Sequence, residues 1–241
     1  LSDAWTTGVL THNGPLVQRL EKELSTHFST TRLAAVTSGT MALQLALNAL
    51  NLRGEVITSP FSWIATCSAI MWENCKPIFA DIDSKTFNID PKAIEEAITP
   101  KTVAIMPVHV FSNPCDVHAI SEIAAHHNLS VIYDAAHAAF VNYRGRSILD
   151  FGDVSATSFH ATKIFNCGEG GACVSSTAEL HESIKRKRFF GHNAEREIVD
   201  LGCNGKMTEL HAALGLANLK YIDATLNSRR SLYERYIHNL R

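Results

Sequence analysis

The chain has 241 residues, of which 46% are hydrophobic and 19% are charged, a balance typical of a globular protein with a sizeable core. This length suits one large α/β domain, or one domain plus part of a second. The formal net charge is −2, so no strong electrostatic field favours nucleic acid or an anionic membrane surface as a partner.

Short β-branched runs alternate with longer helical patterns, such as 39–50 and 119–128. This alternation predicts right-handed crossover units and a mostly parallel sheet with helices on both faces, a three-layer α/β/α fold. From residue 206 to the end the pattern is purely helical, which is typical of a segment that leads into another domain or lies along a partner subunit. The seven predicted strands are 33–38, 55–59, 76–81, 102–108, 130–135, 154–160 and 171–176.

The six cysteines form no CxxC pair and no Cys/His set with zinc spacing, so we predict neither a disulfide framework nor a metal site. The twelve histidines contain no HxxxH or HxH pair, which gives metal-dependent hydrolysis little support. The first ten residues lack the basic and apolar regions of a signal peptide, and no apolar run is long enough to cross a bilayer. A reducing cytoplasm is therefore the expected compartment.

Polar and aromatic side chains follow several of the predicted strands. In an open α/β sheet, ligands bind beyond the carboxyl ends of the strands, so these residues are the candidates for a site. They are Ser38, Gly39 and Thr40 after the first strand, Trp63 after the second, Asp134 and His137 at the fifth, and Ser158, His160 and Lys163 at the sixth.

The segment around Gly39 has two interpretations. A glycine turn at a helix start lets backbone N–H groups face an anion such as phosphate, with support from the helix dipole. An ordinary helix cap by Ser38 or Thr40 explains the same residues.

Asp134 ends an apolar strand, where a carboxylate is costly unless a cation or several donors meet it. A protonated pyridine nitrogen is one such cation, and a cap on the following turn is the alternative. Trp63 could stack on a flat aromatic ligand or fill the core. His137 could donate to a ring hydroxyl or serve only a structural role.

Lys163 lies in the stretch "SFHATKIFNCGEGG", among small and apolar residues. A buried lysine has a depressed pKa, and its neutral amine can bond to an aldehyde. A lysine that reaches out to solvent is the alternative, but this segment follows a strand and has no solvated face. The glycines at 168, 170 and 171 allow a tight turn and close approach of a ligand.

Taken together, these groups describe a site for pyridoxal 5′-phosphate (PLP): a phosphate cradle, a stacking ring, an acid for a ring nitrogen and an amine for an aldehyde. At this point the chain also resembles a known family, the DegT-type PLP-dependent sugar-nucleotide aminotransferases, which have the aspartate aminotransferase (fold type I) architecture. The matching segments, in order, are "GPLVQRLEKEL", "SGTMALQLAL", "PFSWIATCSAI", "PIFADIDSKTFNID", "ITPKTVAIMPVHVFSNPCDV", "VIYDAAHA", "SFHATK…GEGGA" and "GCNGKMTELHAALG".

The resemblance implies a role for each matching position. Lys163 would bond to the cofactor aldehyde and act in catalysis, and Asp134 would pair with the pyridine nitrogen. His137, where many members have Gln, would contact the ring hydroxyl. Trp63 would cover one face of the ring.

The phosphate would be held by Gly39, Thr40 and Ser158 of the same chain. Asn204 would reach the phosphate of the neighbouring subunit's cofactor, which implies an obligate homodimer with shared active sites.

Two features depart from the family pattern. Gly205 and Lys206 stand where members usually have an aromatic residue and an arginine, so the family's contacts do not carry over at these two positions, although Asn204 is kept. The family also continues into a small C-terminal domain. We therefore expect residues 1–220 to form the large PLP-binding domain, and 221–241 to be the start of a second domain in a chain that is incomplete at both ends.

The implied reaction is transamination in two stages, through PLP and its amino form PMP, from L-glutamate to a nucleotide-linked keto-sugar. The motifs are most similar to those of members that convert dTDP-4-keto-6-deoxyglucose to its 4-amino sugar for O-antigen or other surface glycans. A 3-keto or UDP-linked sugar stays open as the substrate. His109, Phe111 and His160 are candidates to line the sugar pocket, and a packing role stays open for each.

Two rival functions remain. Some relatives are dehydratases that carry His in place of the lysine, and the presence of Lys163 argues against that reaction. The other is a non-catalytic protein that uses the PLP fold to bind a ligand. The complete set of catalytic residues argues against it.

Overall fold

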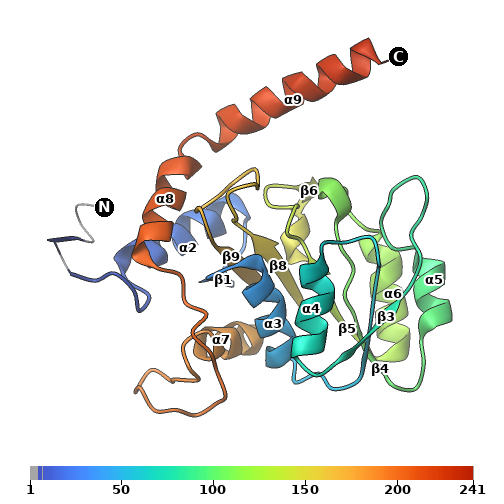
Figure 1. Cartoon of the computed structure of the whole chain (residues 1–241), viewed down its shortest axis with the longest axis horizontal. Helices are drawn as coiled ribbons and strands as arrows, with labels where there is room; N and C mark the ends of the chain where they lie inside the picture. The colour runs from blue at the N-terminus through green and yellow to red at the C-terminus, as the bar shows by residue number, and fades with distance from the viewer. Residues whose placement is uncertain (1–4, 7, 241) are drawn as a thin grey trace.

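The computed structural model describes residues 5–6 and 8–240, and its centre is a seven-stranded sheet (Figure 1). The strand order is β1-β9-β8-β5-β4-β2-β3. The strands are β1 (Leu33–Val36), β2 (Glu55–Thr58), β3 (Lys76–Phe79), β4 (Thr102–Ile105), β5 (Ser130–Asp134), β8 (Val154–Ser158) and β9 (Gly171–Ser175). A separate hairpin consists of β6 (Asn142–Tyr143) and β7 (Arg146–Ser147), which the sequence did not predict.

All neighbours in the large sheet pair in parallel except β9, which is antiparallel to both β1 and β8. The predicted sheet of seven mostly parallel strands is therefore confirmed, although several strands end earlier than expected.

The helices are α2 (Pro15–His27), α3 (Gly39–Ala49), α4 (Ile64–Trp72), α5 (Pro91–Ala97), α6 (Val117–His127), α7 (Ala178–Lys187), α8 (Glu209–Leu219) and α9 (Ile222–Asn239), with short 3₁₀ turns η1 (Val110–Ser112) and η2 (Ile148–Asp150). Five of them begin after a side chain that accepts a backbone N–H, which satisfies part of the helix start. These caps are Ser38, Asp90, Asp116, Thr177 and Thr208.

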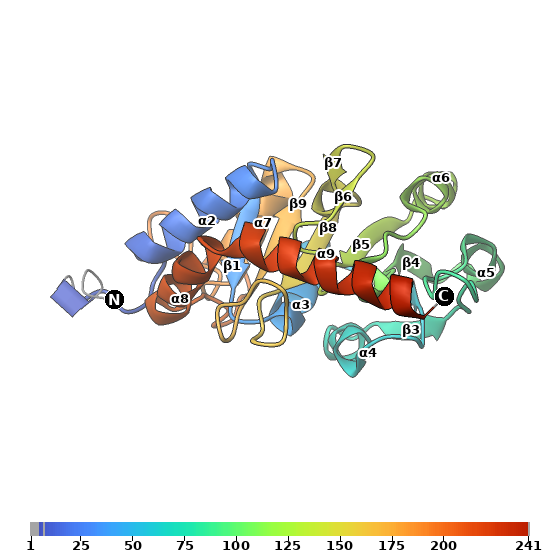
Figure 2. The ribbon, with the colours of Figure 1, turned by 90° about the horizontal axis from the view of Figure 1, so that it is seen from above.

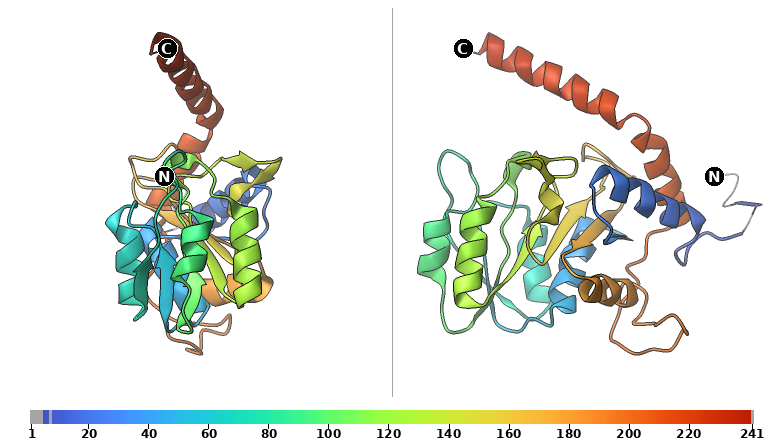
Figure 3. Two further views of the ribbon diagram at one scale, coloured as in Figure 1. Left: turned by 90° about the vertical axis from the view of Figure 1, so that its right-hand side faces the viewer. Right: turned by 180° about the vertical axis from the view of Figure 1, so that it is seen from behind.

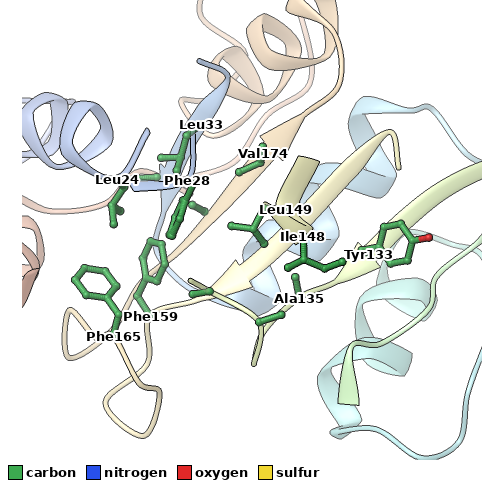
Figure 4. Packing of buried hydrophobic residues seen from close by; sticks show 14 of the residues in the cluster. Leu24, Phe28, Leu33, Tyr133, Ala135, Ile148, Leu149, Phe159, Phe165 and Val174 are labelled. Carbon is green, nitrogen blue, oxygen red and sulfur yellow. The ribbon is translucent and has the colours of Figure 1, made fainter. Parts of the chain in front are cut away.

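The sheet separates two apolar cores because alternate residues of each strand face opposite sides. On β1, Leu33 and Ala35 belong to one core, and Ala34 and Val36 belong to the other. Helices α2, α5, α6 and α8 cover the first core, and α3, α4 and α7 cover the second. Figure 4 shows part of the first core, and Figure 2 shows the helices on the two sides of the sheet. The three-layer α/β/α arrangement is thus confirmed.

The C-terminal segment is not one continuous helix. Helix α8 packs beside α2, the chain turns at residues 220–221, and α9 projects from the body (Figure 3). Within α9 only Ile222 is buried. Assignment of 221–241 to a second domain stays a prediction. None of the helices in the described part of the chain is long and apolar enough to traverse a lipid bilayer.

Glu209, the first residue of α8, links this helix to the start of α2. Its side chain is fully buried, and its carboxylate accepts the backbone N–H groups of Leu16 at 2.8 Å and Val17 at 2.9 Å. N–H groups at the start of a helix have no acceptor within the helix. The residue at the cap position of α2 is Gly14, which has no side chain to accept them. A Cβ atom on Gly14 would lie 2.7 Å from the Glu209 carboxyl carbon, so only glycine leaves room for this contact.

Replacing Glu209 by alanine is expected to lower the free energy of unfolding of the full-length protein by about 3 kcal/mol, because the buried N–H of Val17 and the partly buried N–H of Leu16 lose a carboxylate acceptor. Urea denaturation measures the change. Glu23→Ala is the matched control on α2, because Glu23 pairs with an exposed Arg19 and should matter little. An equal loss of stability in both variants would contradict the capping role of Glu209.

Candidate active site

A cavity of about 660 Å³ lies beyond the carboxyl ends of β1, β2, β4, β5 and β8, where ligands bind in open α/β sheets. Ten of the residues predicted from the sequence line it. They are Ser38, Gly39, Thr40, Trp63, Phe111, Asp134, His137, Ser158, His160 and Lys163. The other two, His109 and Asn204, are not part of its wall.

The start of α3 forms one end of the cavity. Ser38 caps the helix by accepting the N–H of Met41 at 3.1 Å, so the capping interpretation applies to Ser38. Gly39 and Thr40 still face the cavity with the first turn of the helix, whose N–H groups lack intrahelical partners. A Cβ atom on Gly39 would lie 2.8 Å from the Cβ of Ser158, so glycine keeps this end open. The arrangement suits an anionic group.

Asp134 lies at the end of β5 and is only 5% exposed. One carboxylate oxygen accepts the hydroxyl of Thr66 at 2.7 Å, and the other accepts the N–H of Ala136 at 3.1 Å. Burial raises the pKa of Asp134, while these hydrogen bonds and the nearby His137 and Lys163 act in the opposite direction. A positive charge of a ligand within hydrogen-bond reach would lower this pKa further.

Lys163 lies on a tight loop that follows β8. The loop is closed by the N–H of Phe159 donating to the Gly170 carbonyl and that of Ala161 donating to the Gly168 carbonyl, both at 2.8 Å. Gly168 has a φ of +77°, which favours glycine. Burial lowers the pKa of the Lys163 amine, and Asp134 partly opposes this. Within the described residues the amine has no hydrogen bond or ion pair, so it is available to react.

Aromatic rings surround the mouth of the cavity. Trp63 is 78% exposed at the start of α4, so it does not fill the core. The rings of Phe111 and His137 are parallel, with centroids 6.4 Å apart. Burial and the charge of Lys163 lower the pKa of His137, which favours the neutral imidazole. His137 can therefore act as either donor or acceptor toward a ring substituent.

Sequence reasoning missed several polar residues of the site, among them Thr66 and Glu169. Thr66, on α4, is the partner of Asp134 described above. Glu169 lines the cavity, and its carboxylate lies 3.6 Å from Nε2 of His160. The Nδ1 atom of His160 accepts the N–H of Thr162 at 3.2 Å, so the neutral ring carries its proton on Nε2, toward Glu169. The one hint in the sequence was that Glu169 is an acidic residue placed between two glycines of the loop.

His109 is completely buried, and its ring stacks on Tyr133 with centroids 4.6 Å apart. Its Nδ1 accepts the N–H of Cys115 at 3.1 Å. The structure therefore places His109 in the core rather than in the pocket wall, and the packing alternative fits it. Asn204 is exposed outside the cavity and accepts a hydrogen bond from Lys206. Its expected contact with a neighbouring subunit stays a prediction.

The residues of the cavity could hold a planar aromatic aldehyde with a phosphate arm. The start of α3 suits the phosphate, Trp63 offers a ring face, and Asp134 is placed for a cationic ring nitrogen. Lys163 offers the amine for the aldehyde. In the part of the chain that is described, no group of three or more His, Cys, Asp or Glu side chains is arranged to hold a metal ion.

This fold and this cavity define the large-domain architecture of fold type I PLP-dependent enzymes. The comparison with known families agrees, since the model of the DegT/DnrJ/EryC1/StrS aminotransferase family matches residues 1–241. The chain belongs to this family.

Several known proteins are similar over most of the chain. A dTDP-4-amino-4,6-dideoxy-D-glucose transaminase from Shigella dysenteriae is 47% identical, over 93% of this chain and 61% of the relative. One of the same name from Escherichia coli is 41% identical, over 98% of this chain and 64% of the relative. The crystal structure of NtdA from Bacillus subtilis with bound cofactor PMP has a TM-score of 0.86 at 35% identity, over 94% of this chain and 52% of that one. The chain thus spans a little under two-thirds of the length of these curated relatives.

The lowered pKa of Lys163 predicts unusual reactivity toward acylating reagents. The ordinary pKa of lysine is 10.5. At any pH below this value, the fraction of Lys163 that is neutral is larger than that of an ordinary lysine. We expect trace acetylation of the cofactor-free, full-length protein, followed by mass spectrometry across pH, to give a midpoint below 10.5 for Lys163. Because the Asp134 carboxylate raises the pKa of Lys163, Asp134→Asn should move this midpoint still lower. A midpoint at or above 10.5 would show that the cavity does not desolvate the amine.

Proposed function

We propose that this protein is a PLP-dependent aminotransferase that transfers an amino group from L-glutamate to a nucleotide-linked keto-sugar. The observation that carries the proposal is the placement of Lys163 and Asp134 on one cavity, between the start of α3 and the exposed ring of Trp63. Membership of an aminotransferase family supports the same reaction.

Each residue would act on a distinct part of the cofactor. Gly39, Thr40 and Ser158 would hold the phosphate at the start of α3. Trp63 would cover one ring face, and His137 would contact the ring hydroxyl.

The two catalytic residues have complementary roles. When bound, PLP supplies an electron sink that stabilises negative charge on the carbon that loses a proton. Asp134 would keep a positive charge on the ring nitrogen by remaining ionised. Lys163 would anchor the aldehyde, and when released from it the neutral Nζ would take a proton from the substrate carbon and deliver it to the former aldehyde carbon of the cofactor. The lowered pKa of Lys163 favours this role, because a general base should titrate near the working pH.

The sugar we propose is dTDP-4-keto-6-deoxyglucose, which would be converted to its 4-amino derivative for a surface glycan such as O-antigen. The support is that two relatives at 47% and 41% identity are dTDP-4-amino-4,6-dideoxy-D-glucose transaminases. Phe111 and His160 line the cavity and are the residues we propose for contact with the sugar. The alternative substrates are a 3-keto or a UDP-linked sugar.

The test is direct. The full-length protein would be loaded with PLP, converted to the amino form with L-glutamate and freed of glutamate. It would then be incubated separately with dTDP-4-keto-6-deoxyglucose, a dTDP-3-keto sugar and a UDP-4-keto sugar. Mass spectrometry and NMR should show the 4-amino product from the first compound at the highest rate. Preferred amination of another sugar would replace the substrate, and amination of none would overturn the proposed function.

The same experiment addresses the non-catalytic alternative. A protein that only binds a ligand would take up PLP and bind the nucleotide sugar, but L-glutamate would not convert its cofactor to the amino form. Formation of 2-oxoglutarate in the first half-reaction is therefore the discriminating observation. A dehydratase would release no amino sugar, and the presence of Lys163 argues against this reaction.

We also propose a cytoplasmic location, supported by the free thiols of all six cysteines.

We further propose that the active protein is a homodimer in which Asn204 completes the partner's site. The exposed position of Asn204 outside its own cavity is compatible with this role. Two inactive variants, Lys163→Ala and Asn204→Ala, should then complement each other. After unfolding and refolding of an equal mixture, each hybrid dimer has one site with both residues intact.

Random pairing should restore about a quarter of the wild-type activity, since half of the dimers are hybrids and each has one intact site of two. The measurement is transaminase activity before and after mixing, with separately refolded variants as the control. Absence of any gain, in a mixture shown by mass spectrometry to contain hybrids, would place Asn204 in its own subunit's site or in none.

A further inference from the structure

The carboxylate of Asp134 is not held by the cavity alone. Its buried oxygen faces α4, where the Thr66 hydroxyl donates to it at 2.7 Å. Thr66 is 1% exposed, so this hydroxyl has no access to solvent as an alternative partner. The oxygen atom of Ser62 lies 2.6 Å from the same hydroxyl. Three side chains thus form a continuous line from the loop before α4 to the end of β5.

We propose that Thr66 is a positioning residue that keeps Asp134 ionised and correctly oriented, and that Ser62 and Thr66 link this carboxylate to the loop that carries Trp63. The inference concerns the protein's own hydrogen bonds. It rests on the proposed function in one respect, the identification of PLP as the ligand that Asp134 would bind.

The direction of the hydrogen bonds follows from the number of protons available. An ionised carboxylate only accepts, so the single proton of the Thr66 hydroxyl must point to Asp134. The hydroxyl of Ser62 must then donate to Thr66. This order requires that the oxygen facing Thr66 carries no proton. The Thr66 hydroxyl and the Asp134 carboxylate are both buried, and their hydrogen bond is stronger in this low-dielectric interior than in water, which favours the ionised form of Asp134.

Thr66 is needed because burial acts against ionisation. The other groups facing the Asp134 carboxylate are the N–H of Ala136, the His137 ring and the Lys163 amine. Burial lowers the pKa of both His137 and Lys163, so the positive charge that each offers to Asp134 depends on pH. The Thr66 hydroxyl is a neutral donor whose contribution does not change with pH. It is therefore suited to hold the charge before a ligand arrives.

The same segment also places the aromatic ring. Trp63 is the residue before the first turn of α4, and its carbonyl accepts the N–H of Thr66 at 3.2 Å. Ser62 and Thr66 therefore flank Trp63 and bond to each other across it. A change at Thr66 should affect both the charge of Asp134 and the position of the indole ring.

The test compares Thr66→Val, which keeps the shape but loses the hydroxyl, with Thr66→Ser, which keeps the hydroxyl. In the full-length protein, we expect Thr66→Val to weaken PLP binding by about 10- to 100-fold, the range for a hydrogen bond to a charged group. Thr66→Ser should stay within about threefold of wild type, and Ser62→Ala should show a smaller loss than Thr66→Val. The dissociation constant is measured by absorbance titration, and circular dichroism checks folding.

A double-mutant cycle separates this role from simple packing. In an Asp134→Asn background there is no charge to hold, so Thr66→Val should cause little further loss of PLP binding. An equal loss in both backgrounds, or no loss in either, would overturn the proposal. If Thr66→Val proves unstable, Ser62→Ala serves in the same cycle.

A second readout does not depend on the cofactor. With ¹³C-labelled aspartate in the cofactor-free protein, the NMR signal that Asp134→Asn removes reports the titration of Asp134. Thr66→Val should raise this pKa, and Thr66→Ser should leave it near the wild-type value. If wild-type protein fails to bind PLP, the proposed function fails, but this titration still decides the role of Thr66. An unchanged Asp134 pKa in Thr66→Val would overturn it.

Discussion

Replacing Lys163 by alanine is expected to lower kcat for transamination by about 10⁴-fold or more, because one side chain supplies both the covalent anchor and the proton-transfer group. Covalent attachment of PLP should disappear completely, and with it the visible absorbance of the attached cofactor. Non-covalent binding should persist, since the start of α3, Trp63 and Asp134 remain in place. The decisive measurement is the single-turnover rate with L-glutamate, together with borohydride reduction to detect attachment.

Two controls make this prediction sharp. Lys185→Ala removes a partly exposed lysine that pairs with Glu182 on α7 and does not line the cavity, so it should leave the rate unchanged. A small primary amine added to Lys163→Ala should restore part of the proton transfer without restoring attachment. A Lys163→Ala protein that still aminates a keto-sugar with glutamate would remove the basis of the enzyme assignment.

The strands of the sheet were predictable because each carries a short β-branched run between helical patterns. Their ends were not. The predicted strands 102–108 and 154–160 stop at Ile105 and Ser158. Beyond these points the residues still look strand-like, but the chain turns to line the cavity. Only isolated contacts continue the pairing in these described residues, such as the bridge between Val108 and Asp134 and the hydrogen bond from the Phe159 N–H to the Gly170 carbonyl. The two-residue strands β6 and β7 were missed because they are too short to show a period.

The C-terminal helices illustrate a second limit. The segment from residue 206 has an uninterrupted helical composition, with no proline between α8 and α9. The turn at 220–221 is set by tertiary packing, because α8 follows the surface of α2 while α9 leaves it. Local sequence preference is weak compared with such packing, so the break has no local signal.

The candidate site was largely predictable because strand ends determine where the backbone of a residue lies. They do not determine where its side chain points. His109 follows a strand, as Lys163 does, yet its ring turns inward and stacks on Tyr133. Thr66 was missed for the opposite reason, since it lies within an apolar helix and only the fold brings it to Asp134. Contacts between residues far apart in sequence therefore need the structure.

Replacing Asp134 by asparagine is the second change with a very large expected effect. The substitution keeps the shape of the side chain and removes its charge, so a protonated ring nitrogen would lose its counter-ion. Loss of one partner of a buried charge pair costs about 3–5 kcal/mol. At 1.36 kcal/mol for each factor of ten, kcat for transamination should fall by about 10² to 10⁴-fold. The hydrogen bonds add to the cost, because Thr66 and Ala136 both donate to Asp134 and an amide has only one acceptor oxygen.

The matched control is Asp153→Asn. Asp153 lies at the opposite, amino-terminal end of β8, where its carboxylate accepts the N–H of Val131 at 2.8 Å. Loss of this charge should affect stability slightly and kcat little, whereas Asp134→Asn should lower kcat while Lys163 remains attached to the cofactor. Visible absorbance reports attachment of the cofactor, which needs only the amine of Lys163. The value of kcat reports catalysis, which needs the charge of Asp134 as well. Wild-type kcat in Asp134→Asn would mean that no cationic ring nitrogen is held at this carboxylate, and the cofactor would then have to bind in another orientation.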